Sequence, residues 1–425
     1  MNNEQNLRKE LEKLQRAVKE LSLLNDLARS IGASNKLEKI MQKIISYSLR
    51  AVSAEQCTIT LVREKGDDPL KTLVRTMVSK AEHDPFHLNQ VLLGWMLQNK
   101  KPLSIANPQK DARFSRIKWD MEIQSLLCVP LLVKSKLIGI LTAFNKIQAE
   151  KFTPEDLRLL GIIAAHSAQI IENARLYEEE KALLRMKEEL NLARQIQTDL
   201  LPSQIPDVPG YDLAGISVPA ESVGGDYFDF IPVDDHRLAV CLGDVSGKGL
   251  PAALLMSNLQ AIIRSQTMMP GTVAECLKRS NKLLFRNTAP HKFATLFFGI
   301  LDFRSNQFCY ASAGHDRPIL ISANGDIHEL ETAGLPLGFL EEATYIENCF
   351  EFKPDDLLMF YTDGISEAMN KKEEEFGVNR IINFLNRRND ESAQEVIQGL
   401  IEEVKKHANG FSQSDDMTLM VIKKL

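Results

Sequence analysis

Four aspartates stand beside apolar segments that have the length and composition of β-strands, and this recurrence constrains the fold more than any other feature of the chain. The four residues are Asp226, Asp244, Asp363 and Asp415. The region of Asp244 is the most informative, because an apolar run delivers the carboxylate to a turn that contains Gly247 and Gly249, and a helical pattern follows. A strand, a turn and a helix with one solvated carboxylate would explain a single case, but not four.

Aspartates at the ends of several strands can converge on one point of a fold. Carboxylates a few ångströms apart repel one another by roughly 4 kcal/mol per pair at an effective dielectric constant near 20. A bound cation removes this repulsion, and sites built only from oxygen ligands suit Mg²⁺ or Mn²⁺. The pattern therefore predicts a divalent-metal site.

The segments that carry these aspartates resemble motifs of the metal-dependent serine/threonine phosphatases. The resemblance is to the protein phosphatase 2C superfamily, in its bacterial stage-II-sporulation-E-like branch. Four motifs follow one another in the family's order: Gly-Gly-Asp-Tyr-Phe-Asp at 224–229, Gly-Asp-Val-Ser-Gly-Lys-Gly at 243–249, Tyr-Thr-Asp-Gly-Ile-Ser-Glu-Ala at 361–368 and Asp-Asp-Met-Thr at 415–418.

The resemblance implies a catalytic role for each of the four aspartates. Asp244 is expected to bridge two divalent cations, Mn²⁺ or Mg²⁺, and the Val245 carbonyl to ligate one of them. Asp226, Asp363 and Asp415 are expected to complete the second metal's shell. The implied reaction is hydrolysis of a phosphoserine or phosphothreonine by a water that the two cations activate. The implied substrate is a phosphorylated anti-sigma-factor antagonist in a bacterial partner-switching pathway.

The chain departs from the eukaryotic form of this pattern at the bridging motif, and no phosphate-clamping arginine precedes Asp226. Val245 and Ser246 stand where those enzymes have Gly-His, so the acid that protonates the leaving group stays unassigned. His315 is a candidate by residue type, although a loop histidine beside a glycine is more often structural. Lys248 and Arg317 are candidates for steering an anionic substrate.

The predicted fold class is α+β with several domains. An N-terminal coiled-coil helix is expected at 1–22, a sensory domain at 23–172, a coiled-coil signalling linker at 173–201 and the phosphatase domain at 202–425. The sensory region resembles a GAF domain, an antiparallel sheet with flanking helices. For the phosphatase domain the resemblance implies an αββα sandwich, two stacked sheets with helices on both outer faces.

The helical segments predict self-association and signalling. Leu7, Leu11, Leu14 and Val18 alternate steps of four and three, which favours a homodimer through the coiled coils over a helix packed on its own domain. From Pro154 to Leu201 no proline interrupts the pattern, so a continuous helix is expected. It is interpreted as a signalling helix, with a rigid spacer as the alternative.

The ligand of the sensory domain cannot be named from the sequence. Asn145, Lys146, Phe152 and Asp156 fit a motif of GAF domains that bind cyclic nucleotides, but Leu157 stands where that motif has Glu. An unknown small molecule, an activator protein or a purely structural role are the other hypotheses.

Composition narrows the remaining possibilities. The net charge of −6 and the lack of a basic tract argue against nucleic-acid binding. No run of 18 apolar residues predicts a membrane span, and the amino terminus does not resemble a secretion signal, so a cytoplasmic protein is expected. The six cysteines are scattered singly and are expected to be buried thiols rather than a zinc site or a disulfide framework.

Two rival functions have distinct sequence requirements. A diguanylate cyclase carries a Gly-Gly-Asp/Glu-Glu-Phe hairpin, but Tyr227 replaces the second acid here and that fold gives no reason for the other aspartates. A catalytically silent module that recruits a phosphoprotein partner is the main alternative. It predicts the loss of at least one metal position, whereas all four are present.

Overall fold

The computed structural model describes eight helical positions before residue 26 and the ranges 36–62, 70–76, 90–115, 117–147, 151–331, 333–388 and 391–425. The chain divides into two compact units, 1–185 and 186–425. Most of the predicted N-terminal helix lies outside the described residues. Leu7, Leu11, Leu14 and Val18 are helical and exposed. In the described part of the chain, no helix is both long enough and apolar enough to span a membrane.

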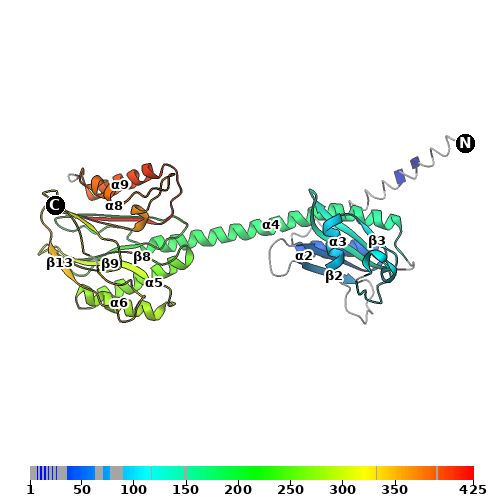
Figure 1. Ribbon diagram of the computed structural model, residues 1–425, viewed down its shortest axis with the longest axis horizontal. Coiled ribbons are helices and arrows are strands. Elements are labelled where there is room, and N and C mark those ends of the chain that lie inside the picture. Colours follow the sequence, from blue (N-terminus) through cyan, green and yellow to red (C-terminus); the bar gives the residue numbers. More distant parts are fainter. Residues whose placement is uncertain are drawn as a thin grey trace. The chain divides into compact units, whose positions relative to one another are not determined.

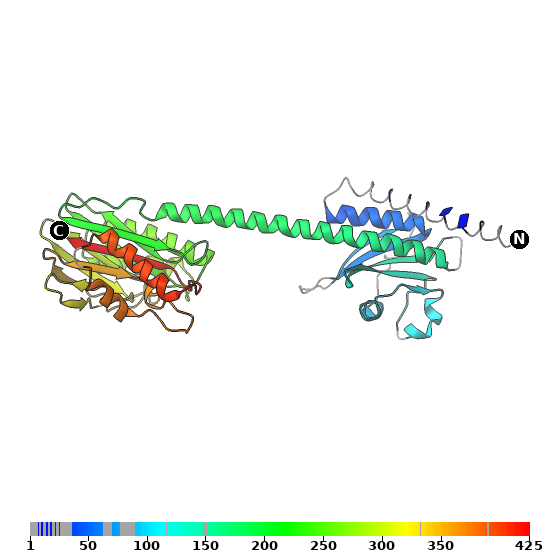
Figure 2. The same ribbon diagram turned by 90° about the horizontal axis from the view of Figure 1, so that it is seen from above.

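The first unit is an antiparallel sheet with helices on both faces. Its strands follow the order β2-β1-β5-β4-β3. Its elements are α2 (Leu37–Ala51), β1 (Ala54–Val62), β2 (Leu70–Thr76), α3 (Gln90–Asn99), β3 (Leu103–Ile105), the 3₁₀ turns η1 (Pro108–Lys110) and η2 (Ala112–Phe114), β4 (Leu126–Val133), β5 (Lys136–Lys146) and α4 (Pro154–Leu200). The helix α2 and the first part of α4 lie side by side on one face of the sheet, while α3 lies on the other (Figure 2).

The start of α4 confirms the predicted helix cap. Thr153 Oγ1 accepts a hydrogen bond from Asp156 N (3.2 Å), and Asp156 Oδ2 accepts one from Thr153 N (2.8 Å), so each satisfies a backbone donor of the other. Lys146 Nζ lies 2.8 Å from Asp156 Oδ1 and fastens β5 to the helix. The Lys146 and Asp156 pair of the predicted ligand motif therefore has a structural role, because it anchors α4.

The second unit has four layers, as the sequence predicted (Figure 1). One sheet has the order β13-β10-β9-β8-β7 and the other β12-β11-β14-β15-β6, and all the pairs are antiparallel. The strands are β6 (Tyr211–Val218), β7 (Tyr227–Pro232), β8 (Arg237–Val245), β9 (Ala294–Asp302), β10 (Gln307–Ala313), β11 (Ile319–Ile321), β12 (Ile327–Glu329), β13 (Asn348–Glu351), β14 (Leu357–Tyr361) and β15 (Met417–Lys424). The helices are α5 (Leu250–Thr267), α6 (Val273–Asn287), α7 (Asp363–Ser366), α8 (Val378–Leu385) and α9 (Ala393–Ala408).

Three hydrophobic cores hold the four layers together. One fills the space between the two sheets, a second lies between the first sheet and α5 and α6, and a third lies between the second sheet and α7, α8 and α9. Along β8, Leu238, Val240 and Leu242 face the opposite sheet, whereas Ala239 and Cys241 face the helices. Burial on both faces explains why this strand is a continuous apolar run rather than an alternating one.

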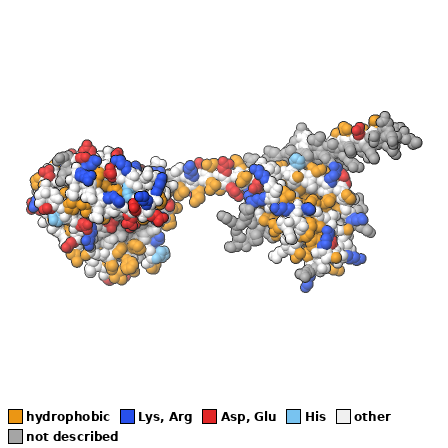
Figure 3. All heavy atoms as spheres, turned by 45° about the horizontal axis from the view of Figure 1, so that its top comes forward, with side chains coloured by type: hydrophobic (Ala, Val, Ile, Leu, Met, Phe, Trp, Pro, Cys, Tyr) orange, Lys and Arg blue, Asp and Glu red, His pale blue; other side chains and the backbone are white. Residues whose placement is uncertain are grey.

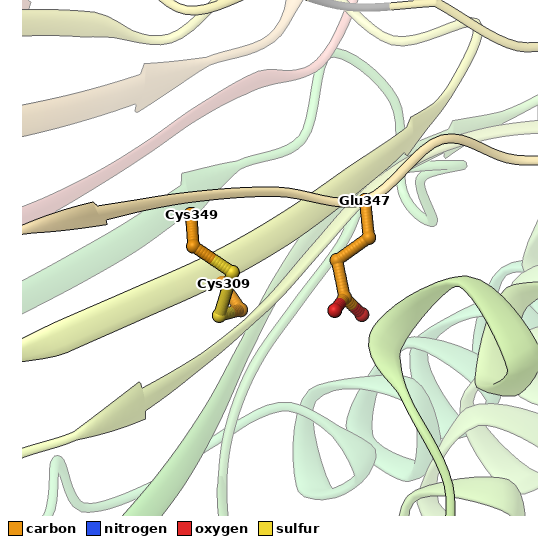
Figure 4. Close-up of side chains that lie close together, drawn as sticks. All are labelled: Cys309, Glu347 and Cys349. Atoms are coloured by element: carbon orange, nitrogen blue, oxygen red, sulfur yellow. A yellow bond between two sulfur atoms is a disulfide. The ribbon is translucent and has the colours of Figure 1, made fainter.

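The cysteine prediction is right for four residues and wrong for two. Cys57, Cys128, Cys241 and Cys276 are free and buried. Cys309 and Cys349 form a disulfide, because β10 and β13 pair in a register that places them directly opposite each other (Figure 4). Their separation of 40 positions in sequence conceals this pairing, since β13 is too short to be recognised from its pattern.

Candidate metal centre

The four predicted aspartates come from both sheets of the sandwich. Asp226 directly precedes β7, and Asp244 is the second-last residue of β8. Both strands belong to the first sheet. Asp363 begins α7 directly after β14, and Asp415 stands two residues before β15, in the second sheet. Burial of Asp244 and the charges of Asp363 and Asp415, together with Asp416, raise its pKa to about 7. The negative charges of these carboxylates therefore repel one another at one end of the two sheets.

Glycines give the backbone room to approach these carboxylates. At Gly225, an added Cβ atom would lie 3.0 Å from Asp244 Oδ1 and 3.3 Å from the Val245 carbonyl oxygen. The segment before Asp226 thus reaches both Asp244 and the carbonyl predicted to bind a metal. At Gly364, an added Cβ atom would collide with the backbone oxygen of Asp416. A larger residue at Gly225 would crowd the end of β8, and one at Gly364 would displace the segment before β15.

Asp226 is the most deeply buried of the four, with 4% of its surface exposed. Its Oδ2 accepts hydrogen bonds from Thr362 Oγ1 (2.8 Å) and Thr418 Oγ1 (2.5 Å), which belong to the opposite sheet. Burial raises the pKa of Asp226 well above its usual value, and the charges of Asp244 and Asp416 raise it further, against the two hydroxyls. A cation beside this carboxylate would remove the cost of its charge.

Asp416 organises the loop that carries Asp226. Its Oδ1 accepts a hydrogen bond from Ala220 N (2.8 Å) and its Oδ2 one from Gly225 N (2.6 Å). Both oxygens are therefore engaged by backbone donors. These contacts hold the loop 220–226 against the start of β15.

Lys248 lies beside the same group of carboxylates. Its Nζ is 3.0 Å from Asp415 Oδ2 and donates a hydrogen bond to the Ser414 carbonyl (2.8 Å). The loop that carries it needs glycine at two positions, because Gly247 and Gly249 have φ of 107° and 67°. Arg317, the other predicted anion-steering residue, pairs instead with Glu329 at 3.6 Å.

Two further polar residues near the site serve the scaffold. Asp229 is fully buried, and its carboxylate accepts hydrogen bonds from Arg264 Nε (2.7 Å) and the Tyr227 hydroxyl (2.8 Å), so it ties β7 to α5. His315 is buried, and its Nδ1 lies 3.0 Å from Thr295 Oγ1. Burial lowers the pKa of His315 to about 4, so the ring is neutral near pH 7.

The donor set fits hard divalent cations, because it consists of carboxylates and one carbonyl oxygen. The four aspartates do not form one compact cluster. Within the described ranges, three potential ligand atoms lie within 4.8 Å of one another only at Cys309, Glu347 and Cys349, and the two sulfurs there are joined to each other. A dispersed set of carboxylates suits two cations better than one.

Sequence reasoning missed the contact between α4 and this loop. Gln197, in the last turn of α4, donates from Nε2 to the Gly224 carbonyl (2.6 Å) and accepts from Gly224 N at Oε1 (3.0 Å). Both groups are buried. The signal available in the sequence was a glutamine at a position of the helical repeat otherwise occupied by apolar residues.

Comparison with known proteins agrees with the predicted domains. Residues 234–424 match the stage II sporulation protein E (SpoIIE) family, and residues 36–171 match the GAF domain. The chain combines a GAF domain with a SpoIIE domain. This confirms the family predicted from the four motifs. The SpoIIE match includes Asp244, Asp363 and Asp415 and begins after Asp226.

Individual relatives are distant. The chain is 29% identical to Protein IcfG of Synechocystis sp. over 263 residues, which are 55% of this chain and 41% of that protein. It is also 29% identical to phosphoserine phosphatase RsbU of Bacillus subtilis over 262 residues, 58% of this chain and 75% of RsbU. The chain thus spans well under two thirds of the first of these relatives.

Among solved structures, the SiaA-PP2C domain of Pseudomonas aeruginosa shares the fold. The TM-score is 0.52 at 19% identity, and the match covers 57% of this chain and 98% of that domain. The four layers of the second unit therefore have the same fold as that domain.

Proposed function

We propose that the chain is a sensor-regulated, metal-dependent protein serine/threonine phosphatase. The observation that carries this proposal is the meeting of Asp226, Asp244, Asp363 and Asp415 at one end of the sandwich, where burial and mutual repulsion raise the pKa of Asp244 to about 7. Such a set of carboxylates is unstable without cations and is suited to holding them. A matching family and a phosphoserine phosphatase among the relatives support the same reaction.

Two divalent cations, Mn²⁺ or Mg²⁺, would be held by the four aspartates and the Val245 carbonyl. Bound there, they supply a water of lowered pKa and positive charge for the phosphate oxygens. The chain's own residues position the loop and attract the substrate. Asp416 and Gly225 fix the position of the loop that carries Asp226. Lys248, on the exposed side of Asp415, supplies a positive charge for attracting an anionic substrate.

The proposed substrate is a small phosphoprotein, a phosphorylated anti-sigma-factor antagonist. The support comes from the relatives, because RsbU carries the name phosphoserine phosphatase. It also comes from the site, because Asp244, Asp363 and Asp415 are only half-buried at the ends of strands. A protein loop bearing one phosphoserine can reach such a site.

Self-association through α4 is part of the proposal. Leu176, Leu183 and Met186 are 51%, 68% and 60% exposed, although they follow the helical repeat of a coiled coil. Hydrophobic side chains are visible among acidic and basic ones on the surface of α4 (Figure 3). A second copy of the chain would bury this stripe.

We also propose that the GAF domain binds an activator, which is a small molecule or a protein. We propose further that the chain acts in the cytoplasm.

Hydrolysis of p-nitrophenyl phosphate tests the phosphatase proposal. The full chain is assayed with EDTA, Mg²⁺ or Mn²⁺, beside Asp244→Asn as the site variant. Metal-dependent turnover that disappears in Asp244→Asn supports the proposal. If neither turnover nor Mn²⁺ binding by calorimetry is found, the proposal is wrong. Metal binding without turnover on either this ester or the phosphoprotein favours the silent recruiting module.

The sensor and dimer proposals have their own test. Light scattering gives the mass of the full chain, of Leu183→Glu, and of a variant that lacks residues 1–174. We expect a dimer for the full chain and a shift toward monomer for Leu183→Glu, since a buried charge at the seam opposes pairing. A monomeric full chain at high concentration would contradict the dimer. Unchanged activity and an unchanged number of subunits after the deletion would contradict sensing.

A further inference from the structure

We propose that Cys309 and Cys349 form a reversible redox clamp on the SpoIIE domain. In its oxidised form the clamp fastens the segment 331–351, and a small thiol reductant releases that segment. The inference is independent of the phosphatase proposal, because it concerns the strand pair β10 and β13 and not the carboxylates.

The disulfide holds a strand that has little else to hold it. The strand β13 has four residues and pairs with one neighbour, β10, at the edge of its sheet. Its residues are alternately half-buried and exposed, and its aromatic contacts are those of Phe350 with Phe308, Tyr310 and Phe352. Local stability follows buried contacts and protected hydrogen bonds, and both are few here. The covalent bond therefore supplies much of what keeps β13 in register.

Glu347 connects the region of the disulfide to α6. Glu347 lies two residues before Cys349, and its carboxylate lies within 4.8 Å of both sulfur atoms (Figure 4). The same carboxylate accepts a hydrogen bond from Val273 N (2.6 Å), at the first turn of α6. A negative charge there satisfies a free backbone donor and complements the helix dipole. When β13 is held in place, this carboxylate is held at the helix.

A second attachment joins the middle of the segment to α6. Asn281 on α6 donates to the carbonyls of Leu340 (2.8 Å) and Glu341 (2.9 Å) and accepts from Gly338 N (2.8 Å). The segment thus has two polar anchors on α6, and the disulfide fixes the end that lies beyond them. Loss of the disulfide leaves the anchor at Glu347 dependent on a short edge strand.

The two sulfur atoms differ in solvent exposure, and this decides which of them a reductant attacks first. Cys349 is exposed, whereas Cys309 is half-buried against the core below the sheet. A thiolate of the reductant attacks the Cys349 sulfur, the bond to Cys309 breaks, and Cys309 leaves as a thiolate that takes up a proton. A second reductant thiol then displaces Cys349. The protein disulfide gains two electrons and two protons, and two reductant thiols become one disulfide.

Thiol labelling of the full chain tests the bond itself. The protein is equilibrated with oxidised glutathione or with dithiothreitol, denatured, labelled with a maleimide and weighed by mass spectrometry. We expect four labels after oxidation and six after reduction, and only four under either condition for the variant Cys309→Ser/Cys349→Ser. Six labels after oxidation of the folded wild-type chain would overturn the proposal.

Hydrogen–deuterium exchange tests the release. We expect amides of 331–351 to exchange about tenfold faster after reduction, while those of β14 stay unchanged. The single variant Cys349→Ser, which changes an exposed side chain, is expected to match the reduced protein under both conditions. Cys57→Ala, in the other unit, is the matched control and is expected to keep the redox response. Equal exchange of 331–351 in both redox states would show that the disulfide does not restrain this segment, and would overturn the proposal.

Discussion

The Gln197 side-chain amide pairs with the backbone of Gly224 through two hydrogen bonds, Nε2 to the carbonyl at 2.6 Å and Oε1 from the amide nitrogen at 3.0 Å. Gly224 is two residues before Asp226, so the last turn of α4 is attached directly to the loop that presents a predicted metal ligand. A change in the position of this turn changes the position of that loop. The contact thus gives a signalling helix a physical means of acting on the site.

Replacement of Gln197 by Ala is expected to weaken metal binding without unfolding the chain. Two buried hydrogen bonds are lost, and the freed loop must be ordered again when a cation binds. The Mn²⁺ concentration at half-maximal binding should rise roughly fivefold to tenfold, measured by calorimetry. Gln195→Ala removes the same side chain from an exposed position of the same turn and is expected to have no effect. Equal effects of the two variants would contradict this role of the contact.

Asp363→Ala is expected to reduce turnover of p-nitrophenyl phosphate by at least about a hundredfold, because a predicted metal ligand is lost. The fold should survive, since Asp363 begins a short helix and repels its neighbours: burial and then the charge of Asp415 raise its pKa. Asp326→Ala, in the turn between β11 and β12, is the control for removing a carboxylate elsewhere. Wild-type turnover of Asp363→Ala at saturating Mn²⁺ would exclude Asp363 from the site.

Arg264→Met is expected to destabilise the SpoIIE domain by about 2–4 kcal/mol, because it leaves the fully buried carboxylate of Asp229 without its cation. The matched control is Arg286→Met on α6. Arg286 pairs with Glu341 at the surface, and such pairs contribute at most about 1 kcal/mol. Urea unfolding followed by fluorescence measures both. A smaller loss for Arg264→Met than for Arg286→Met would show that Asp229 is not held as described.

His315 is expected to make stability depend on pH. Burial, opposed by the backbone of Tyr361, lowers its pKa from 6.5 to about 4, so the native ring stays neutral where the unfolded ring takes up a proton. The contribution of His315 is complete above pH 6.5 and is lost as the pH falls toward 4, by about 2 kcal/mol at pH 5.

Urea unfolding at pH 7.5 and pH 5 checks this sign. The fall in stability between the two values should be smaller in His315→Gln than in the wild-type chain. His291→Gln replaces an exposed histidine and should keep the wild-type difference. A pH response of His315→Gln equal to that of the wild type would mean that His315 does not titrate in this way.

The long, strongly patterned elements were predictable from the sequence. The apolar run that leads to Asp244 and the helical pattern after Gly249 are found as β8 and α5, because a doubly buried strand and a helix after a glycine turn leave clear local signals. The single helix from Pro154 to Leu200 also follows directly from the lack of breakers. These patterns reflect which residues of a single helix or strand are buried.

The missed features depend on contacts between distant segments. The strands β12 and β13 have three and four residues and exist because β11 and β10 pair with them, so no periodicity marks them. The disulfide depends on that pairing, and the bond between Gln197 and Gly224 depends on where α4 ends in space. The aspartates of the site were recognised individually by motif, whereas the anchoring role of Asp416 required the coordinates of Ala220 and Gly225.

Thr362 and Thr418 stand on one sheet of the sandwich, and both donate to the carboxylate of Asp226, which belongs to the other. Thr418 N also donates to Thr362 Oγ1 at 3.0 Å, so the two hydroxyls are set in place by their own sheet. Sliding of one sheet over the other would therefore break the support of a predicted metal ligand. Because cations would bind the native arrangement of the two sheets and not the unfolded chain, saturating Mn²⁺ is expected to raise the melting temperature of the domain as a whole.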